Sequence, residues 1–515
     1  MDMTRRRFFI GGLSAAGSFG AFGGCRFFSV AGFKAGGAPK IRFGVVSDIH
    51  ITKVGADEKM EGWGNNLTFR HTLEWFRSQN VDAVVIAGDM ADNGMVEQME
   101  AVAQAWYAVF PGDRYPDGRP IEKVFVMGNH DYHGYLYGDH AAKRYPDMDE
   151  RAKHVLRSDF ATRWKRIFNE DYSRFYCKKI KGYVFLGQHW DDGKGMETKY
   201  GSCDFGAELK AFLDAKGSGM LDPKLPFFYV QHPHPKDTCY GSWAWGHDRG
   251  KVTKALSAYP NAIAFSGHSH YSLTDERSFW QGAFTSVGTS SLRYSGMPYN
   301  EHPPAGYENT ATEGKGSWRY DAAKMMSRFS AGDCRQGMLW SVYDDCIVVK
   351  RREFLSDLDL GDDWVMPLPA AESKPFAFAE RAKKFRAPSF PAGAKLDVSQ
   401  IKAKNRGGKS RDGKETIAAA KKDAFKIVAP VVVPDKSARL YELEFAAETK
   451  DGAKKTKLVI PEGYNHSLRH KKASSASFCV FAKDELGPGE VRFSVTPINC
   501  FGARGASLAS EWMSV

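Results

Sequence analysis

The sequence predicts an α/β part followed by a small all-β domain. From Lys40 to about residue 355, apolar runs of strand length alternate with amphipathic helical stretches, and this alternation is typical of an α/β layered fold. Beyond residue 425, short β-rich runs are separated by turn residues, which favours a small antiparallel sandwich. A chain of 515 residues is too long for one compact core, so several domains of roughly 100–200 residues each are expected.

The composition excludes several other classes of protein. Hydrophobic residues make up 43% of the chain and charged residues 26%, which is ordinary for a globular protein and excludes wholesale disorder, collagen and coiled coil. The sequence contains no run of roughly eighteen or more apolar residues, so no helix is expected to span a bilayer. Eight cysteines in 515 residues do not amount to a disulfide scaffold.

The basic charge of the chain lies in one region. The formal net charge is +11, and residues 371–472 alone hold 24 Lys and Arg against 12 Asp and Glu. The rest of the chain carries 48 basic and 49 acidic residues, which argues against a nucleic-acid-binding surface around the active site. The basic region is predicted to be solvated, or else to contact an anionic wall, lipid headgroup or polyanion surface.

Residues 39–355 are predicted to form the α/β catalytic domain. Strands are expected where apolar, β-rich residues form short runs, at Ile41–Ser47, Val81–Ala87, Lys123–Met127, Phe227–Gln231 and Ala262–Ser266. Helices are expected where apolar residues recur near helical spacing, at Asn66–Gln79, Val96–Phe110, 151–168, Glu208–Ala215 and Val252–Tyr259. Tyr172–Gln188 is predicted to be a hairpin, and a second hairpin closes the domain with strands Met338–Tyr343 and Cys346–Arg352.

Two further regions follow the catalytic domain. Residues 356–424 are rich in Pro, Ala, Lys and Gly and show little periodicity, so they are predicted to be a linker that packs along the catalytic domain. Residues 425–515 are predicted to form the sandwich, with strands at Ala438–Glu448, Lys457–Ile460, Ser477–Ala482 and Val491–Pro497. The closing stretch Val491–Asn499 resembles the last strands of a fibronectin type III-like module.

Residues 1–38 are predicted to be an export leader. The arginines at positions 5–7 precede two phenylalanines and a weakly apolar, Gly/Ala-rich run to Gly24. This pattern is typical of a signal peptide and resembles a twin-arginine signal; a basic, disordered terminus is the alternative. An imperfect lipobox would make Cys25 a lipid anchor, whereas Ser29-Val30-Ala31 is an equally good ordinary cleavage site. We therefore expect an exported protein, in the periplasm or at the cell surface.

Polar residues stand where the predicted strands end. They follow successive strands as Asp48 and His50, Asp89 and Asp92, Asn129 and His130, His232 and His234, and His268 and His270. Ligands of an open α/β sheet bind outside the carboxyl ends of its strands, so these pairs are expected to converge on one edge. A single D-x-H or H-x-H is more often structural or on the surface, but a repeated occurrence behind successive strands indicates a site.

The residue types at this edge predict a metal site. Carboxylate, imidazole and amide ligands without thiolate suit Mn, Fe, Zn or Co. One carboxylate between two sets of donors is what a bridged two-metal site needs, with the ions roughly 3.5–4 Å apart. Two divalent ions with two aspartates and one hydroxide leave a net positive charge, which matches the negative charge of a phosphodiester. Such ions lower the pKa of bound water towards neutrality and stabilise an in-line transition state.

The motifs D-x-H, G-D-x-x-D, G-N-H-D, a strand-end His and G-H-x-H occur in this order along the chain. Together they resemble the calcineurin-like metallophosphoesterase superfamily, over about residues 40–355. The resemblance implies two packed β-sheets flanked by helices, which is a four-layer arrangement. It also implies hydrolysis of phosphate esters, in which a metal-bound hydroxide attacks phosphorus.

The resemblance assigns a role to each strand-end residue. One metal ion would be held by Asp48, His50, Asp89 and His270. The other would be held by Asp89, as a bridging ligand, with Asn129, His232 and His268. His130 would be the catalytic residue that contacts the phosphate or protonates the leaving oxygen, oriented by an acidic neighbour such as Asp92. The ions are expected to be divalent or trivalent Mn, Fe or Zn.

The fourth motif departs from the family pattern. Family members usually show His-x-Pro or His-His-Pro there, whereas this chain reads His232-Pro233-His234-Pro235. His232 follows the strand most directly and is the preferred ligand, which leaves His234 to line the pocket and bind substrate. Asp92 and Arg293 are further substrate-binding candidates, and Arg293 could pair with a phosphate or carboxylate of the substrate. The alternative for Arg293 is an ordinary surface or packed side chain.

The predicted function is an exported dinuclear phosphoesterase that favours phosphodiesters. Its substrate would be a small-molecule or lipid-headgroup phosphate ester. A phosphomonoesterase or nucleotidase is the alternative enzyme. A metal-free phosphoesterase fold used as a binding module is the remaining alternative, but its signature would be lost ligands, and all the expected ligand positions are filled.

Overall fold

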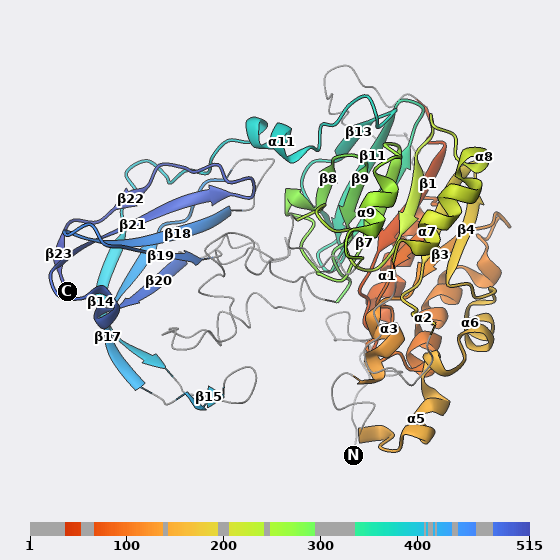
Figure 1. Ribbon diagram of the computed structural model, residues 1–515, viewed down its shortest axis with the longest axis horizontal. Coiled ribbons are helices and arrows are strands. Elements are labelled where there is room, and N and C mark those ends of the chain that lie inside the picture. Colours follow the sequence, from red (N-terminus) through yellow and green to blue (C-terminus); the bar gives the residue numbers. More distant parts are fainter. Residues whose placement is uncertain are drawn as a thin grey trace, which may run out of the picture.

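The structure is a computed structural model, which describes residues 37–52, 66–136, 143–193, 205–240, 248–293, 335–405, 408–409, 416–417, 420–434, 441–459 and 477–515. An α/β part and an all-β part lie on opposite sides of helix α11 (Phe378–Lys384) (Figure 1). The predicted leader, with Cys25, falls almost entirely outside the described residues. Among the described helices, none combines the length and apolarity needed to cross a membrane.

The first sheet of the α/β part contains the amino-terminal strands. β1 (Ile41–Val46), β2 (Ala83–Ala87) and β3 (Glu122–Val126) run parallel to one another. β10 (Gln336–Val342) and β11 (Cys346–Glu353) extend the sheet antiparallel beyond β1, and β12 (Leu358–Asp359) and β13 (Trp364–Pro367) both pair with β11. The carboxyl ends of the three parallel strands therefore meet at one edge.

The second sheet has the order β4-β5-β6-β7-β9-β8. Its strands are β4 (Phe175–Ile180), β5 (Tyr183–Gln188), β6 (Phe227–Val230), β7 (Ala262–Ser266), β8 (Phe279–Gln281) and β9 (Thr285–Gly288). β5, β6, β7 and β9 are parallel, so this sheet also presents several carboxyl strand ends on one side.

Aromatic side chains fill the space between the two sheets. Phe43 of β1 lies with its ring centroid 4.8 Å from that of Phe228 on β6, and Trp340 of β10 lies 4.8 Å from Phe265 on β7. All four side chains are fully buried. Rings of this size bury large apolar areas, and the sheets consequently pack face to face around one core.

Helices cover the outer face of each sheet (Figure 1). α1 (Leu67–Ser78), α2 (Val96–Val109) and α6 (Phe160–Phe168) pack on the first sheet and share its outer hydrophobic cluster. α7 (Ala207–Phe212) and α9 (Lys251–Leu256) share a cluster with the second sheet. The shorter helical segments are Pro111–Asp113, α3 (Asn129–His133), Gly134–Leu136, α5 (Met148–His154), Leu156–Asp159, Leu213–Gly217, α8 (Ser218–Met220) and Glu276–Ser278. The expected arrangement of two packed sheets flanked by helices is confirmed.

The carboxyl-terminal part consists of antiparallel sheets. One contains β14 (Asp397–Asn405), β17 (Ala420–Ala429) and β20 (Ser477–Ala482). Another contains β18 (Tyr441–Thr449), β19 (Lys454–Val459), β21 (Glu490–Asn499), β22 (Leu508–Ala509) and β23 (Met513–Ser514). β15 (Gly408–Lys409) pairs with β16 (Thr416–Ile417), and α12 (Lys483–Leu486) follows β20. Phe493 of β21 lies 5.1 Å from Phe425 of β17, ring centre to ring centre, so the two larger sheets share a core.

The segment 356–424 contains more regular structure than its composition indicated. It contributes β12, β13, α11, β14, β15, β16 and the start of β17. β13 is short, and it forms because Trp364 and Met366 are buried against β11, a contact that local periodicity does not reveal. The short strands β8 and β9 were not predicted either. The domain boundaries and the likeness to a fibronectin type III module stay predictions.

Arg381 of α11 joins the two parts of the chain. Its side chain is 3% exposed and forms an ion pair with Glu276, which follows the second sheet's β7. Glu276 also accepts a hydrogen bond of 2.8 Å from Arg351 of β11. On the other side, the Arg381 guanidinium lies 5.3 Å from the ring centre of Phe501 in the all-β part. This buried charge therefore contacts both parts at once.

We expect the substitution Arg381→Ala to lower the free energy of unfolding by about 3 kcal/mol, because it removes one of the two arginine partners of a buried carboxylate. Denaturant unfolding of the full chain measures this change. Lys383→Ala is the matched control, since Lys383 lies on the same helix with a side chain that is 73% exposed, and its effect should stay within about 0.5 kcal/mol. Equal midpoints for the two variants would contradict the assigned contact.

Candidate metal centre

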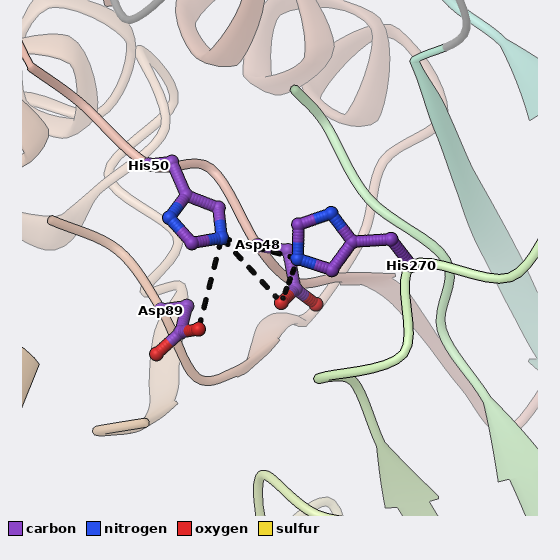
Figure 2. Close-up of side chains that lie close together, drawn as sticks. All are labelled: Asp48, His50, Asp89 and His270. Carbon is purple, nitrogen blue, oxygen red and sulfur yellow. Dashed lines mark hydrogen bonds and ion pairs between the residues drawn. The ribbon is translucent and has the colours of Figure 1, made fainter. Parts of the chain in front are cut away.

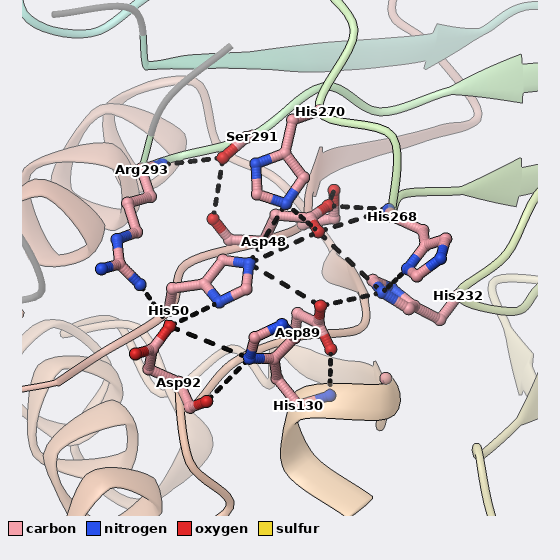
Figure 3. Close-up of polar contacts among 12 residues, drawn as sticks. Asp48, His50, Asp89, Asp92, His130, His232, His268, His270, Ser291 and Arg293 are labelled. Carbon is pink, nitrogen blue, oxygen red and sulfur yellow. Dashed lines mark hydrogen bonds and ion pairs between the residues drawn. The ribbon is translucent and has the colours of Figure 1, made fainter. Parts of the chain in front are cut away.

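The strand-end residues of both sheets meet at one edge of the α/β part. Asp48 and His50 follow β1, and Asp89 follows β2. His232 follows β6 of the second sheet, and the stretch 267–270 follows β7. The side chains come from separate strands but point towards one another (Figure 3). In the structure, the strand-end residues therefore converge on one edge, as predicted.

A first group of four side chains surrounds Asp48. The group consists of Asp48, His50, Asp89 and His270, all buried, with one ligand atom of each within 4.8 Å of the others. Asp48 Oδ1 lies 2.9 Å from His270 Nε2 and 3.7 Å from His50 Nε2. His50 Nε2 lies 3.7 Å from Asp89 Oδ2. Figure 2 shows both imidazole rings turned towards the carboxylates, an arrangement that could hold a cation.

A second group shares Asp89 with the first. It consists of Asp89, His232 and His268. His232 Nε2 lies 3.0 Å from Asp89 Oδ2 and 3.2 Å from His268 Nδ1. The same carboxylate oxygen of Asp89 thus faces His50 of the first group and His232 of the second. Asn129, the remaining predicted ligand, begins α3 next to His130, whose backbone N–H donates to Asp89 Oδ1 at 2.8 Å.

Hydrogen bonds aim the two carboxylates. Asp48 Oδ2 accepts hydrogen bonds from the Ser47 hydroxyl and from the backbone N–H of His268 at 3.1 Å, which leaves Oδ1 directed at the imidazoles. Asp89 Oδ1 accepts a hydrogen bond from the backbone N–H of His130, so Oδ2 lies between the two groups. The orientation of each carboxylate is therefore set by the surrounding chain.

The imidazoles are oriented in the same way. His232 Nδ1 donates to the carbonyl oxygen of Ala87 at 2.7 Å, and His50 Nδ1 donates to Asp92 Oδ1 at 3.1 Å. In each ring the other nitrogen, Nε2, then faces the carboxylates. A histidine whose second nitrogen donates to an oxygen is the arrangement usual in metal sites, because it fixes the ring and its tautomer.

The backbone at the site is strained. Asp48, His50, Asp89, His268 and His270 all have φ between 48° and 70°. This left-handed region costs a residue other than glycine roughly 1–2 kcal/mol. Two backbone hydrogen bonds, Asp48 N–H to Gly88 O at 2.9 Å and His50 N–H to Asp89 O at 3.0 Å, tie the strained turns to each other. Strain of this kind collects at functional sites.

Glycines let the backbone approach the buried side chains. A Cβ on Gly88 would lie 2.2 Å from His232 Nδ1, and one on Gly128 would lie 2.2 Å from Asp89 Oδ1. A Cβ on Gly267 would lie 2.4 Å from Asp48 Oδ2. A larger residue would displace these side chains, which explains the glycine that opens each of the G-D, G-N-H and G-H-x-H motifs.

His130 and Arg293 lie beside Asp92 at the margin of the groups (Figure 3). His130 Nδ1 donates to the backbone carbonyl of Asp92 at 2.7 Å, and its side chain is 27% exposed, compared with 3% for His50. Burial lowers the pKa of His130. The Asp92 carboxylate forms an ion pair with Arg293. Burial raises the pKa of Asp92, but the hydrogen bond and charge of His50, with the charge of Arg293, outweigh it and bring this pKa to about 2.

The donor set fits a borderline-hard metal ion. It consists of carboxylate oxygens and imidazole nitrogens, and no cysteine belongs to the groups found among the described residues, which suits Mn, Fe, Zn or Co. Burial lowers the pKa of His50 and His232, yet the aspartates outweigh burial and raise these pKa values to about 10 and about 9. Surroundings that favour an imidazolium to this extent also favour a metal cation, which binds in place of the protons.

Residues 41–272 match the family model for calcineurin-like phosphoesterases. This part of the chain has the α/β metallophosphoesterase fold. The matched range runs from β1 to the loop after β7 and contains every side chain of the two groups. No curated protein matches the chain.

Several solved structures are similar to the chain at low sequence identity. A predicted phosphoesterase from Streptococcus pneumoniae is 12% identical, and the match covers 64% of this chain and 97% of that chain with a TM-score of 0.25. A purple acid phosphatase from yellow lupin is 11% identical, with coverage of 66% and 57% and a TM-score of 0.36. A zinc complex of Vps29 from Entamoeba histolytica is 10% identical, with coverage of 64% and 99% and a TM-score of 0.28.

His234 does not reach the metal-ligand groups of the metallophosphoesterase domain. It is fully buried, and its Nδ1 and Nε2 each lie 2.7 Å from a serine hydroxyl, that of Ser266 and that of Ser269. The expectation that His234 lines a substrate pocket stays a prediction, whereas His232 is the histidine that lies at Asp89. Burial lowers the pKa of His234 to about 3, so the ring is neutral.

Asp92 contacts three neighbours at the margin of the groups. Its carboxylate pairs with His50 and Arg293, and its carbonyl oxygen accepts from His130. The expected contact between Asp92 and substrate stays a prediction. The predicted orientation of His130 by Asp92 is present, but the backbone oxygen makes the short contact, whereas the carboxylate stands 3.8 Å away.

Sequence reasoning missed Asp131, which connects two turns of the metallophosphoesterase domain. Its buried carboxylate accepts backbone hydrogen bonds from Ala91 at 2.7 Å, Gly128 at 2.9 Å and Met90 at 3.2 Å. Burial and the charge of Asp89 raise the pKa of Asp131 to about 7. The position of Asp131 in the G-N-H-D motif was the signal that could have indicated this role. An acidic residue in the first turn of a helix can accept a hydrogen bond from the backbone N–H of the residue that precedes the helix.

We expect Asp89→Asn to remove metal from both groups, because both use this carboxylate. His270→Ala changes only the first group, so that variant should keep one ion per chain. Metal content after reloading and dialysis of the full chain measures both, and affinity should fall by more than about 100-fold at each site that loses a direct ligand. Full metal occupancy in the Asp89→Asn variant would exclude the shared role.

Proposed function

We propose that this chain is an exported phosphoesterase that uses two metal ions and prefers phosphodiesters. The observation that carries the proposal is the position of Asp89 Oδ2, which lies 3.0 Å from His232 Nε2 and 3.7 Å from His50 Nε2. One carboxylate oxygen between two sets of imidazoles is what a bridged pair of ions requires.

The ligands divide between the two ions along the lines of the two groups. Asp48, His50 and His270 would hold one ion with Asp89, and His232 and His268 would hold the other with Asp89. The family resemblance adds Asn129 to the second ion. Two bound cations supply Lewis acidity towards the phosphoryl oxygens and an activated water. With two aspartates and one hydroxide, the site keeps a net positive charge, which complements the single negative charge of a phosphodiester.

His130 is the proposed proton donor to the leaving oxygen. The carbonyl of Asp92 can only accept, so His130 Nδ1 keeps its hydrogen. The proton for transfer would therefore be the second one of an imidazolium, carried at Nε2. The ring stands next to His50, with 4.6 Å between the ring centroids, and it is partly exposed. Its position allows contact with an incoming ester.

Arg293 is the proposed contact to a negatively charged oxygen of the substrate. Its side chain is 15% exposed, and its backbone is anchored because its N–H donates to Ser291 Oγ at 2.9 Å. Ser291 in turn donates to the carbonyl oxygen of Asp48 at 3.0 Å. The ion pair with Asp92 holds one edge of the guanidinium, and an arginine has further N–H groups for an anion.

The proposed substrates are phosphate esters of small molecules or lipid headgroups, met outside the cytoplasm. Support for export comes from the arginines at 5–7 and the run that follows. The excess of basic residues in 371–472 would hold the protein near an anionic surface.

We expect the full chain, stripped of metal and reloaded with Mn, Fe or Zn, to hydrolyse a chromogenic phosphodiester faster than the matching monoester. The initial rates of the two reactions at equal substrate concentration test this. A preference for the monoester would favour a phosphomonoesterase or nucleotidase. A chain that binds no metal would favour the inert binding module.

His130→Ala should keep both metals but lower kcat by roughly 10²–10⁴-fold, the usual contribution of a general acid. His154→Ala is the matched control, because His154 lies on α5 with a side chain that is 41% exposed. Metal content and steady-state kinetics are measured on the same preparations. An unchanged kcat in the His130 variant would remove this residue from the mechanism.

A further inference from the structure

We propose that His234 is a positioning residue, which holds the loop that carries one histidine of each metal-ligand group. The inference rests on the proposed two-metal function. The loop is residues 267–270, Gly-His-Ser-His, directly after β7. It supplies His270 to the first group and His268 to the second, so its conformation determines the geometry of both.

His234 bridges the end of β7 and the middle of this loop. Its Nδ1 lies 2.7 Å from the hydroxyl of Ser266, the last residue of β7. Its Nε2 lies 2.7 Å from the hydroxyl of Ser269, which stands between the two ligand histidines. Both distances are those of good hydrogen bonds. The rigid ring therefore sets the separation between a strand end and a loop residue.

The loop has a conformation that needs such support. His268 has φ of 70° and His270 has φ of 58°, so Ser269 stands between two residues in the disfavoured left-handed region. The Ser269 hydroxyl also accepts from the N–H of Tyr271 at 3.3 Å. One serine side chain therefore links the loop forwards to Tyr271 and across to His234.

Two other roles for His234 fit the structure less well. A ligand or substrate contact would need a nitrogen that faces the groups. Nε2 is instead directed at Ser269, and Nδ1 at Ser266, with Cys239 Sγ 3.4 Å from the same nitrogen. A residue that merely fills the core would be apolar, because a fully buried imidazole needs partners for two polar atoms. The two hydroxyls match those atoms, which identifies a specific bridge. The two histidines of His232-Pro233-His234 thus have different roles. His232 is the ligand, and His234 is the bridge that holds the loop.

The test compares two amides that mimic one ring nitrogen each. In His234→Gln the amide can reach the Nε2 position and bond Ser269, whereas in His234→Asn it reaches only the Nδ1 position and Ser266. We expect His234→Asn to weaken Mn²⁺ binding at both sites by about tenfold, in the range for residues behind the ligands, and His234→Gln to restore most of it. Calorimetric titration of the full chain with Mn²⁺ measures affinity and stoichiometry.

Ser269→Ala provides an independent measurement that changes only a half-buried hydroxyl. It should weaken Mn²⁺ binding at least as much as His234→Asn does, because it also removes the bond from the Tyr271 N–H. The double variant should be no weaker than Ser269→Ala, because both lose the bond between residues 234 and 269. Unfolding of each variant in excess chelator reports stability without metal. A purely structural role predicts that the loss of affinity follows the loss of stability and that Gln and Asn behave alike.

The outcomes separate this inference from the proposed function. Wild-type affinity in Ser269→Ala, or equal affinities in the Gln and Asn variants of His234, would overturn the positioning role while the two-metal site stands. A wild-type chain that binds no Mn²⁺, Fe or Zn would overturn the proposed function, and the inference with it. Weaker Mn²⁺ binding in His234→Asn and in Ser269→Ala, with recovery in His234→Gln, supports both the positioning role and the proposed function.

Discussion

The shared carboxylate of Asp89 is the constraint on which the rest of the α/β part depends. Its Oδ2 must lie within reach of His50, which follows a strand of the first sheet, and of His232, which follows a strand of the second. This is possible only if the two sheets are packed with their carboxyl strand ends on the same side. The ring contact between Phe43 and Phe228 in the shared core therefore determines the spacing of the polar edge.

The turns that bring carboxylates and imidazoles this close have a strained backbone. Contacts of nearby residues offset this strain. The ligand-bearing turns adopt left-handed backbone, and glycines give the neighbouring chain room to approach. Asp131 fastens the turns after β2 and β3 to each other, and the Ser47 hydroxyl fixes Asp48. These hydrogen bonds hold the carboxylates in place through the chain itself, without any ligand.

Much of the fold and of the candidate site could be predicted from the sequence, because both depend on local patterns. Buried strands appear as apolar runs, and each polar pair directly behind a strand is visible without knowledge of tertiary structure. What could not be predicted depends on contacts between distant residues. The two serines that bond His234 follow it by 32 and 35 positions, and β13 is too short for its periodicity to distinguish it from a linker. Only the pairing of β13 with β11 makes it a strand.

That pairing has a consequence for how the chain can be divided. The apolar half of β11, Cys346–Val349, takes its outer hydrogen bonds from β13, at residues 364–367. A fragment that stopped near residue 355 would leave these backbone groups without partners on an exposed strand that is prone to aggregation. In the longer chain the outermost strand ends instead at Pro367, whose ring nitrogen has no hydrogen to offer a neighbouring sheet. A segment that resembles a linker thus protects the first sheet from self-association.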